Sequence, residues 1–175
     1  INALRATYDD LLPASGMLLD LMSAWRSHLP SRFTRSPDVE VVGLGMNADE
    51  MADNYQLSRF IVHDLNQTPS LPFEDGAFDS AVCAVSVQYL TQPVAVFEEV
   101  ARVLKPGALF VVSFSNRCFP TKAVAVWHAG SDDEHIALVR DYFARSGSWS
   151  SAQTRSYQPR TSDPLFSVWA TAHPN

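Results

Sequence analysis

The most informative part of the sequence runs from Asp64 to Leu109 and reads DLNQTPSLPFEDGAFDSAVCAVSVQYLTQPVAVFEEVARVLKPGAL. Within it, the apolar run from Phe78 to Val85 predicts a buried strand. Pro93 then opens a segment whose apolar residues recur at helical spacing, and Lys105-Pro106-Gly107 ends that helix. The segment Ala108–Phe114, rich in β-branched and aromatic residues, predicts another strand. This stretch therefore predicts two parallel strands that are joined by a crossover helix.

The same alternation of strands and helices continues on both sides of this stretch. The further predicted strands are Met17–Met22, Val39–Val42, Arg59–Asp64, Trp149–Tyr157 and Leu165–Thr171, and the further predicted helices are residues 2–12, a helix that starts at Asn47, and Glu134–Arg145. The last two strands flank a Pro-rich turn, which predicts a hairpin. We therefore expect an α/β fold with a Rossmann-like, mostly parallel sheet of about seven strands, one C-terminal antiparallel strand, and helices on both faces.

Length and composition restrict the class of protein. The chain has 175 residues, of which 46% are apolar and 18% are charged, and this is the composition of a globular protein. We expect a single domain over residues 1–175. The first residue is Ile1 rather than Met, so the N-terminus is expected to be truncated.

Charge and hydropathy point to a small molecule, or another protein, as the partner. The formal net charge is −6, the only lysines are Lys105 and Lys122, and no basic cluster forms. We therefore expect neither a nucleic acid nor an anionic membrane surface as the partner. No apolar stretch reaches the roughly 20 residues of a membrane-spanning helix. Cys83 and Cys118 do not form a disulfide framework, which favours a reducing, cytoplasmic compartment.

One short motif suggests a dinucleotide cofactor. The stretch Gly43-Leu44-Gly45-Met46-Asn47-Ala48 matches the G-x-G-x-x-A pattern of dinucleotide-binding folds, and Asp64 follows about 20 residues later. Taken alone, this pattern predicts a nicotinamide-dependent oxidoreductase. One observation counts against this interpretation. The strand before Gly43 is already preceded by another predicted strand, which has a terminal acid of its own, Asp20.

The region from Asp64 to Leu109 resembles the central part of Rossmann-like methyltransferases that use S-adenosylmethionine. The likeness rests on Leu71-Pro72-Phe73-Glu74-Asp75 with the following Phe78-Asp79, and on the segment Glu99–Gly107, which reads EVARVLKPG. In that family the first motif joins the third strand to the fourth, and the second joins the fourth helix to the fifth strand. A looser resemblance covers about residues 15–172.

The resemblance implies a cofactor site at the carboxyl ends of the first four strands. Asp64 would accept a hydrogen bond from the adenine amine, and the next backbone N–H would complete the contact. Asp20 would bind the turn that follows it or the ammonium group of the cofactor. The residues assigned to cofactor binding are Asp20, Met22, Ser23, Trp25, Gly45, Met46, Asn47, Asp64, Leu65 and Ser86.

The sequence departs from the family pattern at two places. The glycine-rich turn after the first strand aligns with Asp20–Arg26, where Met22, Ala24 and Arg26 replace all three glycines. The acid that binds the ribose hydroxyls is also absent from Gly45-Met46-Asn47, although Asn47 is able to hydrogen-bond a hydroxyl group as a neutral residue. These changes imply an altered cofactor pose or no cofactor binding.

Catalytic residues are less well defined than the cofactor site. His28 is the histidine nearest to the predicted site and is a candidate base, with an ordinary packed histidine as the alternative. Tyr89 or Gln88 would orient an acceptor or simply pack. No metal site is predicted, because the acids and histidines between His128 and His135 adjoin a helix start, where acids are favoured anyway.

Three functions are consistent with these patterns. The first is a methyltransferase that transfers a methyl group from S-adenosylmethionine to a small-molecule acceptor, in which the cofactor supplies the reactive group. The second is a methyltransferase-like module that binds a ligand without catalysis, which the missing glycines suggest. The third is the nicotinamide-dependent oxidoreductase. The sequence does not identify the acceptor or the oligomeric state.

Overall fold

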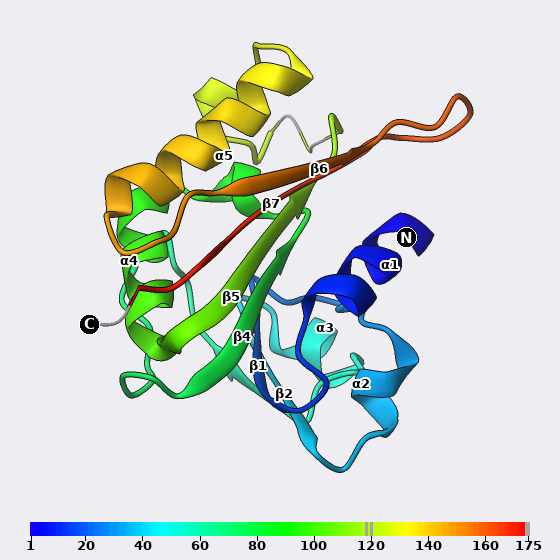
Figure 1. Ribbon diagram of the computed structural model, residues 1–175, viewed down its shortest axis with the longest axis vertical. Helices are drawn as coiled ribbons and strands as arrows, with labels where there is room; N and C mark the ends of the chain where they lie inside the picture. Colours follow the sequence, from blue (N-terminus) through cyan, green and yellow to red (C-terminus); the bar gives the residue numbers. More distant parts are fainter. Residues whose placement is uncertain (118, 120, 174–175) are drawn as a thin grey trace.

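A single seven-stranded sheet organises the chain in the computed structural model, which describes residues 1–117, 119 and 121–173. The strands lie in the order β3-β2-β1-β4-β5-β7-β6 (Figure 1). They are β1 (Gly16–Leu21), β2 (Val39–Gly45), β3 (Arg59–Val62), β4 (Phe78–Ala84), β5 (Leu104–Phe114), β6 (Gln153–Tyr157) and β7 (Leu165–Thr171). Strands β1 to β5 pair in parallel, whereas β7 runs antiparallel to both β5 and β6. The predicted fold class is confirmed.

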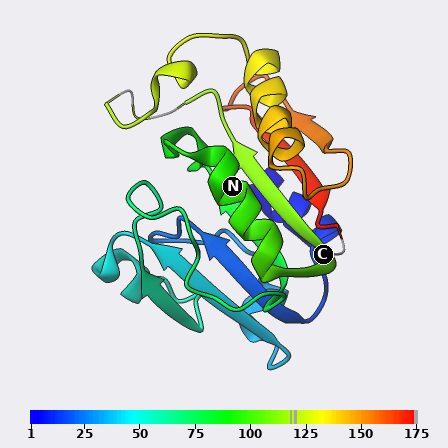
Figure 2. The same ribbon diagram turned by 90° about the vertical axis from the view of Figure 1, so that its left-hand side faces the viewer.

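Helices cover both faces of this sheet. They are α1 (Asn2–Leu11), α2 (Ser31–Arg35), α3 (Ala48–Ala52), α4 (Pro93–Val103) and α5 (Asp132–Ser146), with 3₁₀ turns at η1 (Val87–Tyr89) and η2 (Ala125–Trp127). Helices α4 and α5 lie together on one face, in front of the sheet in Figure 2, and α1, α2 and α3 lie on the other side in Figure 1. No helix among the described residues combines the length and the apolar character needed to cross a membrane.

Two apolar cores separate the helices from the sheet. Under α4 and α5 the core is aromatic, because Phe97 meets Phe110 and Phe143 edge to face at centroid distances of 5.1 and 4.7 Å. Under α1 and α2, Tyr8 and Phe33 pack with residues of β1, β2, β4 and β5. Alternate residues of each central strand therefore serve opposite cores, as expected for a sheet that is buried on both faces.

The two sequence motifs that predicted the fold are in contact. Arg102, on α4, donates to the carbonyl oxygens of Leu71 and Phe73 at 3.0 and 2.9 Å and to the carboxylate of Asp75. Glu99, one turn earlier, accepts from the Leu71 N–H at 2.7 Å and from Arg102. The E-x-x-R motif of the helix therefore holds the LPF-x-D loop against the start of β4.

Helix and strand ends differ from their predicted positions for identifiable reasons. Helix α5 begins two residues earlier than expected, because the side chain of Ser131 caps it in a reciprocal capping box with Glu134. The last strand pair is shorter than predicted, since Trp149 forms only an isolated bridge with Ala172 before β6 begins. Strand β3 stops at Val62 instead of Asp64.

The largest differences concern β1 and β2. Strand β2 was expected to end at Val42, but it continues to Gly45 and pairs with β3 over its last four residues. Strand β1 ends at Leu21, and residues 22–30 form no helix before the five-residue α2. An irregular turn therefore follows β1, in the place where a βαβ unit usually begins its helix.

Candidate functional site

The carboxyl ends of the parallel strands meet at one edge of the sheet. Leu21 at the end of β1 pairs with Leu44 on one side and with Cys83 on the other. Gly45 pairs with Val62 at the end of β3, and Ala84 pairs with Ser113 on β5. The loops that follow these strands carry the predicted site residues, so the fold brings them to a common edge, where ligands of open α/β sheets bind.

The turn after β1 is organised around a buried carboxylate. Asp20 is only 2% exposed, and one of its oxygens, Oδ2, accepts hydrogen bonds from the hydroxyls of Ser23 and Ser27 at 2.6 Å each. Asn54 holds the turn from the other side, because its Nδ2 donates to Ser27 Oγ at 3.0 Å and to the carbonyl of Ala24 at 2.9 Å. Burial raises the pKa of Asp20, and the two serine hydroxyls offset part of that effect.

This arrangement corresponds to one of the two roles considered for Asp20, the binding of its own turn. The carboxylate binds its own turn, and in this structure it is not presented to a ligand at the surface. Ser27 and Asn54 are structural partners of this turn that the sequence analysis did not assign to the site. Ser27 lies in a local pattern of serines at positions 23 and 27, whereas Asn54 lies 27 residues further along and no local signal connects it to the turn.

The turn after β1 contains a residue other than glycine in a backbone conformation that glycine usually adopts. Met22 has a positive φ of 57°, a conformation that glycine adopts at less cost. The Ser23 N–H then donates to the Leu44 carbonyl at 2.8 Å, which keeps the turn attached to β2. A Cβ atom at Gly45 would lie less than 3.0 Å from the carbonyl oxygen of Ser23, closer than Cβ contacts in proteins. Glycine is thus required on β2 and not on the turn.

The end of β2 presents an apolar side chain. Met46 is 65% exposed, whereas Asn47 accepts from the N–H groups of Asp49 and Glu50 as the N-cap of α3 and donates to Glu50 Oε1 at 3.1 Å. The amide of Asn47 is thus engaged by the helix in this structure, and the binding of a ligand hydroxyl by Asn47 stays a prediction. The dinucleotide-type interpretation of Gly43–Ala48 is corrected, since both glycines lie within β2 and not in a phosphate-binding turn.

Asp64, beyond the end of β3, is half-buried and retains acceptor capacity. Its Oδ1 accepts from the Asn66 N–H and its Oδ2 from Gln67 Nε2, both at 2.9 Å. A carboxylate has about four lone-pair sites, so two acceptor positions remain. The side chain of the next residue, Leu65, is buried and fixes the backbone beside this carboxylate.

The loops after β3, β4 and β5 are joined through Tyr89. Its carbonyl accepts from Asn66 Nδ2 at 2.9 Å, and its hydroxyl accepts from the Phe119 N–H at 3.1 Å. Ser86 is half-buried and donates to the Ala84 carbonyl. Gln88 is 1% exposed and donates to the Val85 carbonyl, while its Oε1 has no hydrogen-bond partner among the described residues. The buried side chain of Gln88 therefore stabilises the loop after β4 from the protein interior.

The remaining candidates have mainly structural surroundings. His28 has a positive φ of 56°, and burial first and nearby positive charges second lower its pKa. His135 stacks on Trp127 at a centroid distance of 4.6 Å. Among the described residues, no group of three or more potential metal ligands comes together. Burial raises the pKa of Cys83 to about 12, so its thiol is unreactive, and Cys118 lies outside the described residues.

Trp25 is the large exposed side chain of the turn after β1. Its side chain is 51% exposed, although a tryptophan is more often packed in a core. The Trp25 side chain is therefore available to line one side of a ligand site beside the strand ends.

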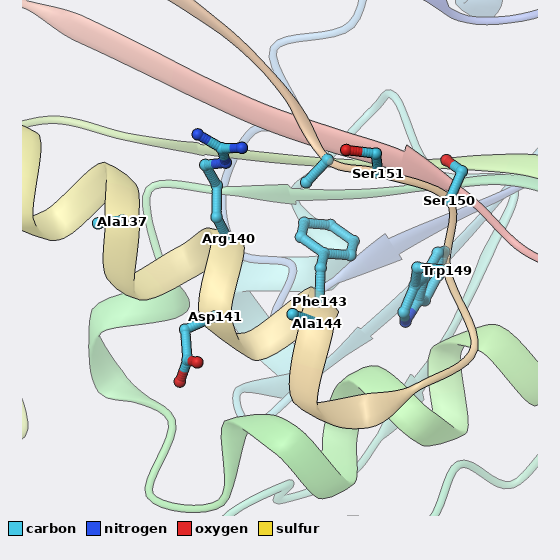
Figure 3. Close-up of a pocket in the computed structure, with 9 residues that line it drawn as sticks. Ala137, Arg140, Asp141, Phe143, Ala144, Trp149, Ser150 and Ser151 are labelled. Carbon is cyan, nitrogen blue, oxygen red and sulfur yellow. The ribbon is translucent and has the colours of Figure 1, made fainter.

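Two cavities lie away from these strand ends. A groove of about 450 Å³ separates α5 from residues 149–152, with Arg140 and Phe143 on the helix and Trp149 and Ser151 opposite them (Figure 3). The bridge from Trp149 to Ala172, which bonds to Ala108, places this groove near the start of β5. A second cavity, of about 830 Å³, is lined by residues at the starts of β1, β3 and β4. Both cavities are therefore at the opposite edge of the sheet.

Comparison with known proteins provides both a sequence match and a fold match. The model of a family described as "Methyltransferase domain" matches residues 32–112. A biotin biosynthesis bifunctional protein, BioHC, from Teredinibacter turnerae is 34% identical over 71 residues, which cover 41% of this chain and 12% of that protein. The matched part is thus a small fraction of that relative.

Solved structures of low identity share the whole fold. A putative methyltransferase in complex with the Haloferax volcanii activator Trm112 has a TM-score of 0.71 at 17% identity, covering 98% of this chain and 89% of that one. The [4+2]-cyclase SpnF has a TM-score of 0.70 at 17% identity, covering 99% and 80%. Phosphoethanolamine N-methyltransferase 2 of Haemonchus contortus, solved with S-adenosyl-L-methionine, has a TM-score of 0.66 at 12% identity, covering 99% and 52%.

Proposed function

We propose that this chain is a methyltransferase that transfers a methyl group from S-adenosylmethionine to a small-molecule acceptor. The family match to residues 32–112 supports the domain assignment, and the sheet order supports the fold. The observation that carries the proposal is the position of Asp64. It lies two residues beyond the end of β3 with unused acceptor capacity, and β3 pairs with the end of β2, after which Met46 is exposed.

The residues present fit the adenine part of the cofactor. The carboxylate of Asp64 is able to accept from an exocyclic amine, the Leu65 N–H is a suitable donor to a ring nitrogen, and Met46 offers an apolar surface to a ring face. The methionine part would lie along the turn after β1, beside Met22, Ser23 and Trp25, and close to Ser86. When bound, S-adenosylmethionine supplies an electrophilic methyl group.

The protein must then position the acceptor and exclude water. The loops joined by Tyr89 are suited to this task, because Tyr89 links the segments that follow β3, β4 and β5. His28 is the candidate base for acceptors that retain a proton, since a lowered pKa keeps its imidazole neutral near pH 7. An acceptor that is already deprotonated needs no such base.

A small molecule is the acceptor class that the surface favours. The net charge of −6 and the presence of only two lysines disfavour nucleic acid. Segment 113–133 and the start of the chain would determine which acceptor binds. The absence of a disulfide framework in the sequence favours a cytoplasmic location.

Isothermal titration calorimetry with S-adenosylmethionine and S-adenosylhomocysteine tests this proposal, with NADH as the comparator. We expect micromolar binding of both sulfur nucleosides, weakened at least tenfold by Asp64→Ala and unchanged by Glu74→Ala, an exposed acid at the opposite edge of the sheet. A folded, full-length protein that binds neither nucleoside contradicts the proposal. Binding of NADH alone would revive the oxidoreductase.

A second function is favoured by one observation. The turn after β1 is held closed by side chains, and the same fold serves a [4+2]-cyclase, so the domain is able to support binding or chemistry without methyl transfer. Binding of S-adenosylmethionine without turnover on any acceptor in a broad screen would support that alternative.

A further inference from the structure

The end of β2 cannot carry a side chain at the position nearest to the turn after β1. Gly45 is buried, and a Cβ atom there would meet the Ser23 carbonyl oxygen on one side and the sulfur of Met51 at 3.1 Å on another. The first obstacle is backbone, which does not move aside as a flexible side chain does. Because Asp20, Ser27 and Asn54 hold this turn through four hydrogen bonds, the obstacle is fixed in place.

The residues that follow Gly45 do not compensate for the missing side chain. Met46 is apolar, and the amide of Asn47 is engaged at both its oxygen and its nitrogen by α3. Of the nearby carboxylates, Asp20 is buried in the turn, whereas Asp49 and Glu50 belong to the first turn of α3, where Glu50 accepts from Asn47. Segment 45–47 therefore offers no free side-chain acceptor to a pair of hydroxyl groups.

The polar groups that are able to bind a ligand lie instead after the neighbouring strand, β3. Asp64 keeps two acceptor positions, and the buried Leu65 side chain fixes the adjacent backbone. A ligand that spans the ends of β2 and β3 thus meets an apolar surface at Met46 and polar groups at Asp64.

We infer that the site recognises its nucleoside through the base at the end of β3 and leaves the ribose hydroxyls without a carboxylate partner at the end of β2. This inference rests on the proposed function, because it takes the ligand to be an S-adenosyl compound. A hydroxyl bound to a charged acceptor contributes roughly ten- to hundredfold in affinity, and here that contribution is absent. The site therefore tolerates changes in the ribose and discriminates against changes in the base.

The test is a calorimetric series on the unaltered full-length protein. The ligands are S-adenosylhomocysteine, its 2′-deoxy and 3′-deoxy analogues, and S-inosylhomocysteine, in which the amine is replaced by a carbonyl. We expect both deoxy analogues to bind within fivefold of the parent compound and the inosyl analogue to bind more than tenfold more weakly. A loss of more than fivefold with either deoxy analogue overturns the inference while leaving the proposed function intact. Absence of binding by S-adenosylhomocysteine overturns the proposed function itself.

A substitution at Gly45 gives a second readout. Gly45→Asp adds a carboxylate at this position, and we expect it to displace the turn and weaken binding of S-adenosylhomocysteine and of its deoxy analogues equally. Selective strengthening of the parent compound over the deoxy analogues would show that the position is open to a ribose-binding acid, and would overturn the inference. The analogue series on the unaltered protein remains decisive if this variant does not fold.

Discussion

The carbonyl oxygen of Ser23 occupies the space in which a side chain at Gly45 would begin. This contact joins the turn after β1 to the end of β2, the two places where the sequence departs most from the methyltransferase pattern. The two departures are therefore one structural change. The turn crosses onto β2 through the Ser23 N–H bond to Leu44, and a glycine at position 45 makes room for it.

A pair of glycine substitutions measures this contact. Gly45→Ala should lower the free energy of unfolding by about 1–3 kcal/mol, because the new Cβ meets a fixed carbonyl group. Gly43→Ala is the matched control, since it lies on the same face of β2 but the three atoms nearest to its Cβ all belong to the flexible side chain of Leu57, whose Cδ1 is nearest at 2.6 Å. Urea denaturation of the two variants provides the comparison. An equal loss in both would show that the turn yields as easily as a leucine side chain.

The buried carboxylate of Asp20 should produce a measurable pH dependence of stability. Burial raises its pKa in the folded state above the unfolded value near 3.8, so the folded protein binds more protons in this window. The stabilisation from this proton is complete below pH 3.8 and is lost as the pH rises through the folded-state pKa. Asp20→Asn removes this dependence.

Urea denaturation between pH 4 and pH 7 tests the prediction. The free energy of unfolding of the wild type, minus that of Asp20→Asn, should fall as the pH rises. Groups with lowered pKa values, such as Glu99 beside Arg102, change stability in the opposite sense but are common to both proteins and cancel. A difference that is flat across this range would contradict a raised pKa for Asp20.

The contact between the two fold-determining motifs predicts a large effect at Arg102. Its guanidinium bonds to two backbone carbonyls and two carboxylates, a geometry that the single ammonium of lysine does not reproduce. Arg102→Lys should therefore destabilise the protein by about 2 kcal/mol, from the loss of several charge-assisted bonds. Arg145→Lys is the control, because Arg145 is exposed and its one ion pair with a described residue is to Asp141, at 3.6 Å. In thermal denaturation, the Tm of Arg102→Lys should be several degrees below that of Arg145→Lys.

These residues also show what could be predicted from the sequence and what could not. The strand and helix around Arg102 were predicted because apolar periodicity and a Pro-Gly stop are local signals. The extension of β2 through Gly43 and Gly45 was not predicted, because glycines normally mark turns, and here their role depends on Leu57 and Ser23 packing against the strand. The role of Asp20 likewise depended on Asn54, which supports the turn from a distant part of the chain.

The hydroxyl of Tyr89 should control the order of the loop after β5. Tyr89→Phe removes the acceptor for the Phe119 N–H but keeps the Tyr89 carbonyl bond to Asn66. We expect faster amide hydrogen exchange at Phe119 and in the residues after it, with little change at Asn66 or Asp64. If this loop forms part of the acceptor site, the variant should bind S-adenosylhomocysteine as the wild type does, yet show a raised KM for the acceptor in the methyl-transfer assay. Unchanged exchange at Phe119 would show that other contacts hold the loop, and weakened nucleoside binding would place Tyr89 in the cofactor site instead.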